Sequence, residues 1–247
     1  MKIFNRFLRA AKMGVTGGDM KSYELVCHDS DPQWLSKRFE FVTASEMAAV
    51  IGVSPWSNRE DVIRRKVTRS DDFKPTRNMW WGSELERFNM ESFTKITGIR
   101  TRSCNAFLRS TESPRIAATI DGFALRPRND FEPLDIATKV PWASDLRAAL
   151  KGRSGLGLIE MKNTEAWFGK KWHEGPPLHY TIQLQQQLYV TGLDWGILCA
   201  KIGAGDMIAY LIDADPLLHM EMDEDARSIW KEIEDERKEL NEYFDRT

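Results

Sequence analysis

Two charged residues, Glu160 and Lys162, lie two positions apart in the segment Gly157–Asn163 of this 247-residue chain. If this segment is a β-strand, both side chains point to one face, and Ile159 and Met161 point to the other. A carboxylate beside an ammonium group can serve hydrolysis at a metal ion, but it can equally be an ordinary surface ion pair. Taken alone, the pair therefore does not predict catalysis.

A second acid, Asp121, follows an apolar strand-like run and precedes Gly122. A glycine here is typical of a tight turn, so Asp121 is predicted to lie where a strand ends, and forming that turn could be its whole role. Two acids at the edge of a sheet can instead share Mg²⁺, which prefers oxygen ligands. In that reading Asp121, Glu160 and the backbone carbonyl of Met161 bind Mg²⁺, and Lys162 orients a bound water.

Two predicted helices could each add one side chain to such a site. Glu86 lies in the helix expected over Trp80–Thr97, at the border of its apolar face, and should be less solvated than Glu84. Gln183 lies in the helix expected over Leu178–Thr191 and could hydrogen-bond the water or a phosphate oxygen. Both could also be plain surface residues, and Gln187 shares the side of Gln183. The apolar face of the first helix would comprise Trp81, Leu85, Phe88 and Ile96, with Met90 and Phe93 close to Glu86.

The segment Trp167–His173 combines four aromatic or imidazole rings with Gly169, Lys170 and Lys171. Aromatic rings beside cations suit exposed bases and phosphates, although an amphipathic helix would have the same composition. The chain contains neither a P-loop nor a dinucleotide-binding fingerprint nor a His/Cys zinc spacing.

The periodicity of the chain predicts an α/β or α+β domain with a mixed sheet and helices packed against it. Helices are expected over Phe4–Met13, Gln33–Arg38, Ala44–Ile51, Arg59–Val67, Trp80–Thr97, Leu178–Thr191 and Pro216–Phe244. Strands are expected over Asn105–Arg109, Ile116–Leu125, Leu156–Lys162, Gly196–Ile202 and Met207–Ile212. The stretch Arg126–Gly155 has no assignable element and is expected to be a surface excursion.

The charge balance restricts how the protein could meet a polyanion. The 35 Lys and Arg nearly match the 37 Asp and Glu, which excludes a uniformly basic surface and requires any DNA contact to be local. Three widely spaced cysteines suggest neither a disulfide framework nor a metal site, and no apolar segment predicts secretion or membrane insertion. We therefore expect a cytoplasmic protein.

Five segments, in this order, resemble the motifs of the YqaJ-type viral recombinase family, the lambda exonuclease type within the PD-(D/E)XK nuclease superfamily. The resemblance spans roughly Trp34 to Asp215, and each motif is weak by itself, so the order carries it. The segments are Trp34–Glu46, Trp81–Glu86, Ile120–Gly122, Ile159–Lys162 and Tyr180–Gln185. One departure is the separation of 39 positions between Asp121 and Glu160, which implies an insertion at 126–155.

The resemblance implies a PD-(D/E)XK core and a role for each matched residue. Asp121, Glu160 and Lys162 would be catalytic, Glu86 and Gln183 would support them, and Arg38, Ser45 and Trp34 would bind the substrate. We further expect a basic arm (1–22), a nuclease domain (23–215) and a charged C-terminal helix (216–247), of which the arm and the helix lie outside the resemblance.

The resemblance implies that the protein is a Mg²⁺-dependent 5′-to-3′ exonuclease, with Mn²⁺ able to substitute for Mg²⁺. Such an enzyme degrades one strand of linear double-stranded DNA from a 5′ phosphate and leaves a 3′ overhang for a single-strand annealing protein. The resemblance further implies a homotrimer encoded by a phage or prophage and working in the host cytoplasm, away from the membrane. The alternatives are an endonuclease or single-strand-preferring nuclease of the same fold, and a non-catalytic DNA-binding subunit.

Overall fold

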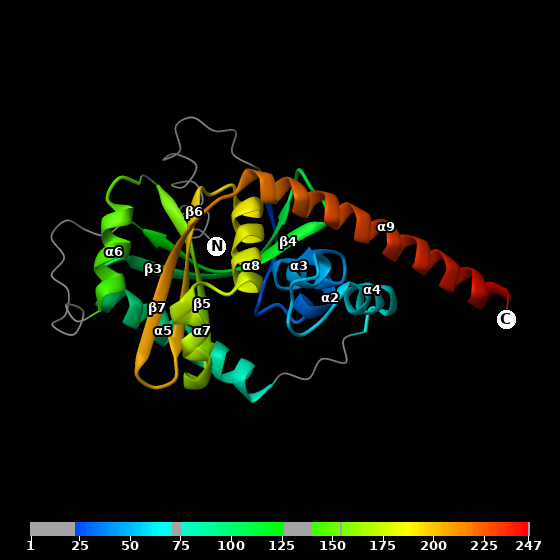
Figure 1. Cartoon of the computed structure of the whole chain (residues 1–247). Helices are drawn as coiled ribbons and strands as arrows, with labels where there is room; N and C mark the ends of the chain where they lie inside the picture. Colours follow the sequence, from blue (N-terminus) through cyan, green and yellow to red (C-terminus); the bar gives the residue numbers. More distant parts are fainter. Residues whose placement is uncertain (1–22, 71–75, 126–139, 154, 247) are drawn as a thin grey trace.

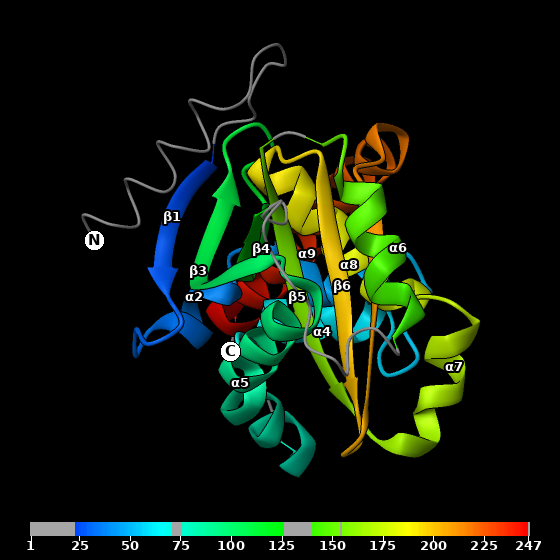
Figure 2. The ribbon, with the colours of Figure 1, turned by 90° about the vertical axis from the view of Figure 1, so that its left-hand side faces the viewer.

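The computed structural model of the chain describes residues 23–70, 76–125, 140–153 and 155–246, so the helix predicted over Phe4–Met13 lies outside the described residues. The described residues form a seven-stranded mixed sheet. Six strands follow the order β1-β3-β4-β5-β6-β7, which Figure 2 shows from β1 to β6, and the short β2 pairs with β4 beside this path. Its strands are β1 (Tyr23–His28), β2 (Val42–Thr43), β3 (Arg100–Ser110), β4 (Ile116–Leu125), β5 (Leu156–Thr164), β6 (Trp195–Ile202) and β7 (Asp206–Asp213).

Helices cover both faces of this sheet (Figure 1). They are α2 (Trp34–Arg38), α3 (Ala44–Val50), α4 (Arg59–Thr68), α5 (Arg77–Thr97), α6 (Pro141–Leu150), α7 (Gly169–Glu174), α8 (Leu178–Thr191) and α9 (Pro216–Arg246), with a 3₁₀ turn, η2, at Ala166–Phe168. The larger core lies between the sheet and α3, α4, α8 and α9. A second core lies on the opposite face under α5 and α6. The predicted mixed sheet between helical layers is therefore confirmed.

The central strands combine two kinds of pairing. Strand β4 pairs antiparallel with β3 and with β5, whereas β5 pairs parallel with β6. A parallel pair needs a long crossover, and here η2, α7 and α8 provide it. Strand β5 thus separates the antiparallel half of the sheet from a β-α-β unit.

Strand β4 has the predicted bounds, but β3 begins at Arg100 instead of Asn105. The strand pairing shifts between Ser103 and Ala106, and Asn105 has a positive φ of 48°. This bulge interrupts the two-residue alternation, which explains why the pattern showed only the second half of the strand.

The apolar face predicted for α5 is wrong in its first half. Trp81 and Phe88 are 41% and 58% exposed, whereas Met90 and Phe93 are buried. Among the described residues of α5, burial begins at Asn89, because only the C-terminal part of the helix packs against the sheet.

The described part of the expected surface excursion also differs from the prediction. Helix α6 buries Ala143, Leu146 and Leu150 in the second core. Pro141 occupies the first helical position, which its fixed φ suits, so the proline that suggested a loop instead begins a helix.

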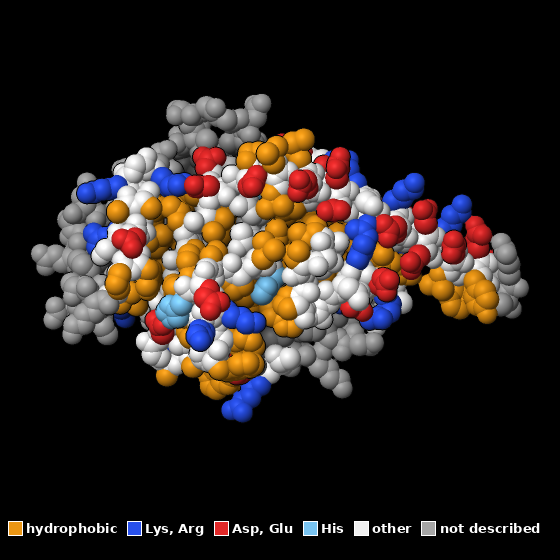
Figure 3. All heavy atoms as spheres, viewed as in Figure 1, with side chains coloured by type: hydrophobic (Ala, Val, Ile, Leu, Met, Phe, Trp, Pro, Cys, Tyr) orange, Lys and Arg blue, Asp and Glu red, His pale blue; other side chains and the backbone are white. Residues whose placement is uncertain are grey.

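Helix α9 forms over the range predicted for the charged C-terminal helix and extends away from the body (Figure 1). Its apolar stripe is buried only in part, because Ile229, Trp230 and Ile233 reach the core and Leu240 and Phe244 are exposed. Figure 3 shows acidic side chains along this helix. No described helix is long and apolar enough to cross a membrane.

Candidate active site

Asp121 lies next to β5 because the pairing of Gly122 with Ile159 continues the β4–β5 ladder up to this point. The Met161 amide donates a hydrogen bond to Oδ2 of Asp121 over 3.1 Å. The Asp121 carboxylate therefore accepts a hydrogen bond of the kind that a backbone carbonyl accepts in a regular β-ladder. This bond holds Asp121 beside the segment that contains Glu160.

The predicted turn at Gly122 is wrong, because β4 continues to Leu125. Glycine is required there for a different reason. A Cβ at this position would lie 2.7 Å from the backbone carbonyl oxygen of Arg102 on β3. The motif Asp121-Gly122 thus reflects a close approach of two strands and not the end of one.

Glu160 is 1% exposed, and both of its carboxylate oxygens have partners. Oε1 accepts from Gln183 Nε2 at 2.6 Å and lies 2.5 Å from the Lys162 ammonium group. Oε2 accepts from Gln187 Nε2 at 2.5 Å, and the same amide reaches the carbonyl of Thr119 at 2.9 Å. The structure thus brings Glu160, Lys162 and Gln183 together as the sequence predicts, and adds Gln187.

Gln187 was not selected from the sequence, although its spacing of four from Gln183 puts both on one side of α8. That spacing was the available signal. It did not reveal that Gln187 is buried and contacts two strands, because the position of α8 on the sheet is a tertiary feature.

Lys162 is held in one orientation by contacts on several sides. Its ammonium group donates to Gln183 Oε1 at 3.0 Å and lies 4.8 Å from the ring centroid of Tyr180. Burial opposes its charge, but Glu160 and Asp121 outweigh burial and raise the pKa of Lys162 to about 12. The side chain is therefore a cation throughout the physiological pH range.

Burial and the charge of Glu160 both disfavour the ionised forms of Asp121 and Glu86. Burial, followed by the charge of Glu160, raises the pKa of Asp121 well above its usual value. The same two causes, in the same order, raise the pKa of Glu86 to about 7. Glu86 is partly buried and Glu84 is exposed, as predicted.

A divalent cation would relieve this repulsion, so the acids fit such an ion. Within the described ranges no three His, Cys, Asp or Glu side chains group closely enough to hold a metal. The available ligands are the Asp121 and Glu160 carboxylates and the Met161 carbonyl, an all-oxygen set that suits Mg²⁺ with water in its remaining positions.

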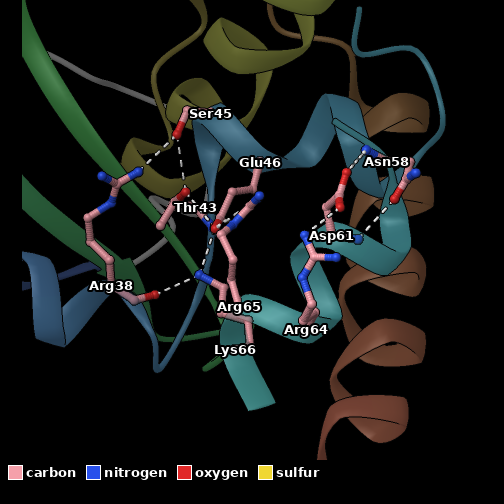
Figure 4. A network of polar contacts seen from close by, with 9 residues as sticks. All are labelled: Arg38, Thr43, Ser45, Glu46, Asn58, Asp61, Arg64, Arg65 and Lys66. Carbon is pink, nitrogen blue, oxygen red and sulfur yellow. Dashed lines mark hydrogen bonds and ion pairs between the residues drawn. The ribbon is translucent and has the colours of Figure 1, made fainter. Parts of the chain in front are cut away.

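A second polar group, Trp34, Arg38 and Ser45, is also brought together as expected. The Arg38 guanidinium lies 4.8 Å from the Trp34 ring centroid and donates to Ser45 Oγ at 3.1 Å. Figure 4 shows the Arg38 side chain reaching Ser45 from α2. The guanidinium stacks on a ring and bonds a hydroxyl, so its charge is available to an anion.

The aromatic and basic segment Trp167–His173 is divided between solvent and core. Trp167 and Phe168 are exposed and lie with their ring centroids 3.9 Å apart. Trp172 is 2% exposed and stacks on Tyr180 at 5.6 Å. The exposed rings of Trp167 and Phe168 fit a surface for bases, and the buried Trp172 fits an amphipathic helix.

The sequence did not reveal Trp56, which is 70% exposed in the connection between α3 and α4. Its ring lies 4.5 Å from the ring of His179 and 5.8 Å from that of Tyr180. Burial lowers the pKa of His179 to about 4, so this imidazole is neutral at physiological pH. An aromatic surface therefore extends from Trp56 to the Tyr180 ring, which contacts Lys162.

Comparisons with known proteins agree with this geometry. The family model described as the YqaJ-like viral recombinase domain matches residues 33–194. The structure resembles that of LHK-Exo in complex with dAMP, with a TM-score of 0.66, 19% identity and coverage of 87% of this chain and 98% of that one. LHK-Exo is an alkaline exonuclease from Laribacter hongkongensis, and a second structure of it gives a TM-score of 0.65 at 19% identity, with the same coverage.

A phage-related exonuclease from Haemophilus somnus 129PT also has this fold. Its TM-score is 0.56 at 15% identity, over 81% of this chain and 96% of that one. At such identities the likeness concerns the fold. No curated protein matches the sequence significantly.

Proposed function

Because the chain belongs to the YqaJ-like viral recombinase domain family, we propose that it is a metal-dependent exonuclease that degrades one strand of linear double-stranded DNA from the 5′ end. The observation that carries this proposal is the meeting of Asp121, Glu160 and Lys162 at the β4–β5 ladder. The structures that share its fold are described as exonucleases, which supports this reaction class.

Asp121, Glu160 and the Met161 carbonyl would hold Mg²⁺, or Mn²⁺ in its place. When bound, the ion lowers the pKa of a coordinated water and offsets charge on the scissile phosphate. The repulsion from Glu160, which adds to burial in raising the pKa values of Asp121 and Glu86, supports a divalent ion here.

The surrounding side chains prepare the site for hydrolysis. Lys162 is a fixed cation that can hydrogen-bond the attacking water and stabilise charge that develops on phosphorus. Gln183 joins Lys162 to Glu160 and keeps both in one geometry. Glu86, with a pKa of about 7, can accept a proton from that water or bind it.

Trp34, Arg38 and Ser45 would recognise the end of the DNA. A guanidinium that stacks on a ring and bonds a hydroxyl can grip a terminal 5′ phosphate with its remaining donors. The acids on α9 make that side of the protein unfavourable for DNA (Figure 3). The duplex would instead contact the cationic groups of Arg38 and Lys162.

The same family membership supports several wider proposals. The product would be a 3′ overhang for a single-strand annealing protein, and the assembly would be a homotrimer. The gene would belong to a phage or prophage, and the enzyme would work in the host cytoplasm. The chain would consist of a basic arm (1–22), a nuclease domain (23–215) with an insertion at 126–155, and a charged C-terminal helix (216–247).

The test compares linear duplexes with a 5′ phosphate or a 5′ hydroxyl, labelled at either end of one strand, with Mg²⁺ or with a chelator. We expect Mg²⁺-dependent release of nucleotides from the 5′ phosphate end and no activity in Asp121→Ala. A covalently closed circle should remain intact, and its cleavage would favour an endonuclease. If neither duplex is degraded and calorimetry detects no Mg²⁺ binding, the protein is a non-catalytic DNA-binding subunit.

A further inference from the structure

A closed ring of hydrogen bonds begins and ends at Arg38 (Figure 4). The Arg38 guanidinium donates to Ser45 Oγ at 3.1 Å, and Ser45 Oγ lies 3.2 Å from Thr43 Oγ1. Thr43 Oγ1 donates to Glu46 Oε2 at 2.7 Å. Lys66 closes the ring, because its ammonium group donates to Glu46 Oε2 at 2.7 Å and to the backbone carbonyl of Arg38 at 2.8 Å.

The charge of Glu46 fixes the direction of the hydroxyl bonds in this ring. Burial opposes ionisation, but Lys66 and Arg38 outweigh it and lower the pKa of Glu46, so the side chain accepts hydrogen bonds only. The single hydroxyl hydrogen of Thr43 therefore goes to Glu46. The hydroxyl hydrogen of Ser45 must then go to Thr43, which leaves the lone pairs of Ser45 to accept from Arg38.

Lys66 is the cation that pairs most closely with the Glu46 carboxylate. Lys66 is 1% exposed and contacts the carboxylate directly, while Arg65 lies 3.9 Å from the other oxygen. The Arg38 guanidinium lies close enough to influence the pKa of Glu46, yet it bonds Ser45 instead of the carboxylate. Without Lys66, Glu46 would attract the guanidinium of Arg38 and compete with any anion for it.

We infer that Lys66 and Glu46 are positioning residues that hold Arg38 and Ser45 ready for a terminal 5′ phosphate and keep the Arg38 charge free for it. This inference rests on the proposed function, because it assumes that Arg38 binds that phosphate. Lys66 would act at both ends of Arg38, on the backbone by a hydrogen bond and on the side chain by occupying Glu46.

The experiment measures binding of the full chain to blunt duplexes with a 5′ phosphate or a 5′ hydroxyl, by fluorescence anisotropy in a chelator. The ratio of the two dissociation constants is the phosphate preference. Lys66→Met is expected to lose most of this preference, as Arg38→Ala should. The double variant Glu46→Gln with Lys66→Met is expected to regain part of it, because a neutral amide attracts Arg38 less than a carboxylate does and still accepts from Thr43. The bond from Lys66 to the Arg38 carbonyl stays lost in this variant.

Arg64→Met is the matched control, since Arg64 lies on the same helix and pairs with Asp61 at the surface. It should keep the wild-type preference. If Arg38→Ala keeps the preference, the proposed grip on the 5′ phosphate fails. If Arg38→Ala loses it and Lys66→Met does not, the inference fails. It also fails if the double variant stays as defective as Lys66→Met, because the loss is then not one of charge.

A buried carboxylate left without its partner can prevent folding. If Lys66→Met does not fold, Thr43→Val tests the same ring without an unpaired charge. This variant removes the acceptor of the Ser45 hydroxyl hydrogen, and a reduced phosphate preference is expected. An unchanged preference in Thr43→Val overturns the inference.

Discussion

Gln187 Nε2 lies 2.5 Å from Glu160 Oε2 and, through its second hydrogen, 2.9 Å from the carbonyl of Thr119. One buried amide thus joins α8 to both central strands at the candidate site. Gln187→Leu would remove a donor from a buried carboxylate oxygen and from the Thr119 carbonyl, so we expect a loss of about 1–3 kcal/mol in unfolding free energy. Urea denaturation measures it. Gln183→Leu, at a less buried position, should lower the unfolding free energy less but should reduce activity. Equal losses of unfolding free energy in the two variants would contradict the structural role assigned to Gln187.

Lys162→Arg is expected to be nearly as inactive as Lys162→Met, although it keeps the positive charge. The ammonium group is placed among Glu160, Gln183 and the Tyr180 ring, and a planar guanidinium directs its donors differently. A loss of about 10²–10³-fold in the single-turnover rate is the expected size for a group that stabilises charge developing in the transition state. An arginine variant within a few-fold of wild type would show that only charge matters.

The metal-free protein should become less stable as the pH rises toward neutrality. The pKa of Glu86 is raised to about 7 in the folded state, so this acid favours folding below its unfolded pKa and loses that contribution as pH rises through 7. Thermal unfolding between pH 5 and 8 in a chelator measures the slope. Glu86→Gln should make this slope less steep, with Asp121 still contributing to it, and Glu84→Gln, at an exposed position, should leave it unchanged. A wild-type curve that is flat over this range would refute the assignment.

Gly122→Ala should destabilise the protein by about 1–3 kcal/mol, because the new methyl group would meet the Arg102 carbonyl at 2.7 Å. The adjacent Asp121 should shift as well, which weakens Mg²⁺ binding in calorimetry. Gly82→Ala is the control, since nothing lies within 4 Å of a Cβ there and α5 should gain about 0.5–1 kcal/mol. If the Gly122 variant has wild-type stability, the strands have room to separate.

The sequence predicted the central strands and the pairing of Glu160 with Lys162 because these depend on local alternation. Strand β1 was not predicted, since Glu24 and Leu25 are both exposed and no alternation marks this edge strand. Helix α6 follows a segment rich in proline and charge that obscures its three buried residues. The turn assigned to Gly122 was wrong because a close contact with another strand leaves no trace in the local pattern.

The partners of Glu160 could be predicted only in part. Gln183 followed from the order of motifs, whereas Gln187 depends on how deeply α8 sits on the sheet. The shared position of Trp34, Arg38 and Ser45 was implied by the family resemblance. The ring through Lys66 was not, because Lys66 is a charged helical residue that a sequence pattern would assign to the surface.

The β5-α8-β6 crossover contains Glu160, Lys162, Gln183 and Gln187. Asp121 lies outside it on β4, which pairs with β5 and accepts a hydrogen bond from Gln187 at Thr119. This division bears on the order of folding. The bonds of Glu160 to Gln183 and Gln187 join residues 23 and 27 positions apart, whereas the bond between Asp121 and Met161 joins residues 40 positions apart. The second kind of contact therefore closes a longer loop, at a greater cost in entropy. A chain that has folded only its crossover holds an ion pair and no second acid for a cation. The folding chain would therefore become able to cut DNA only in the last step, when the whole sheet has formed.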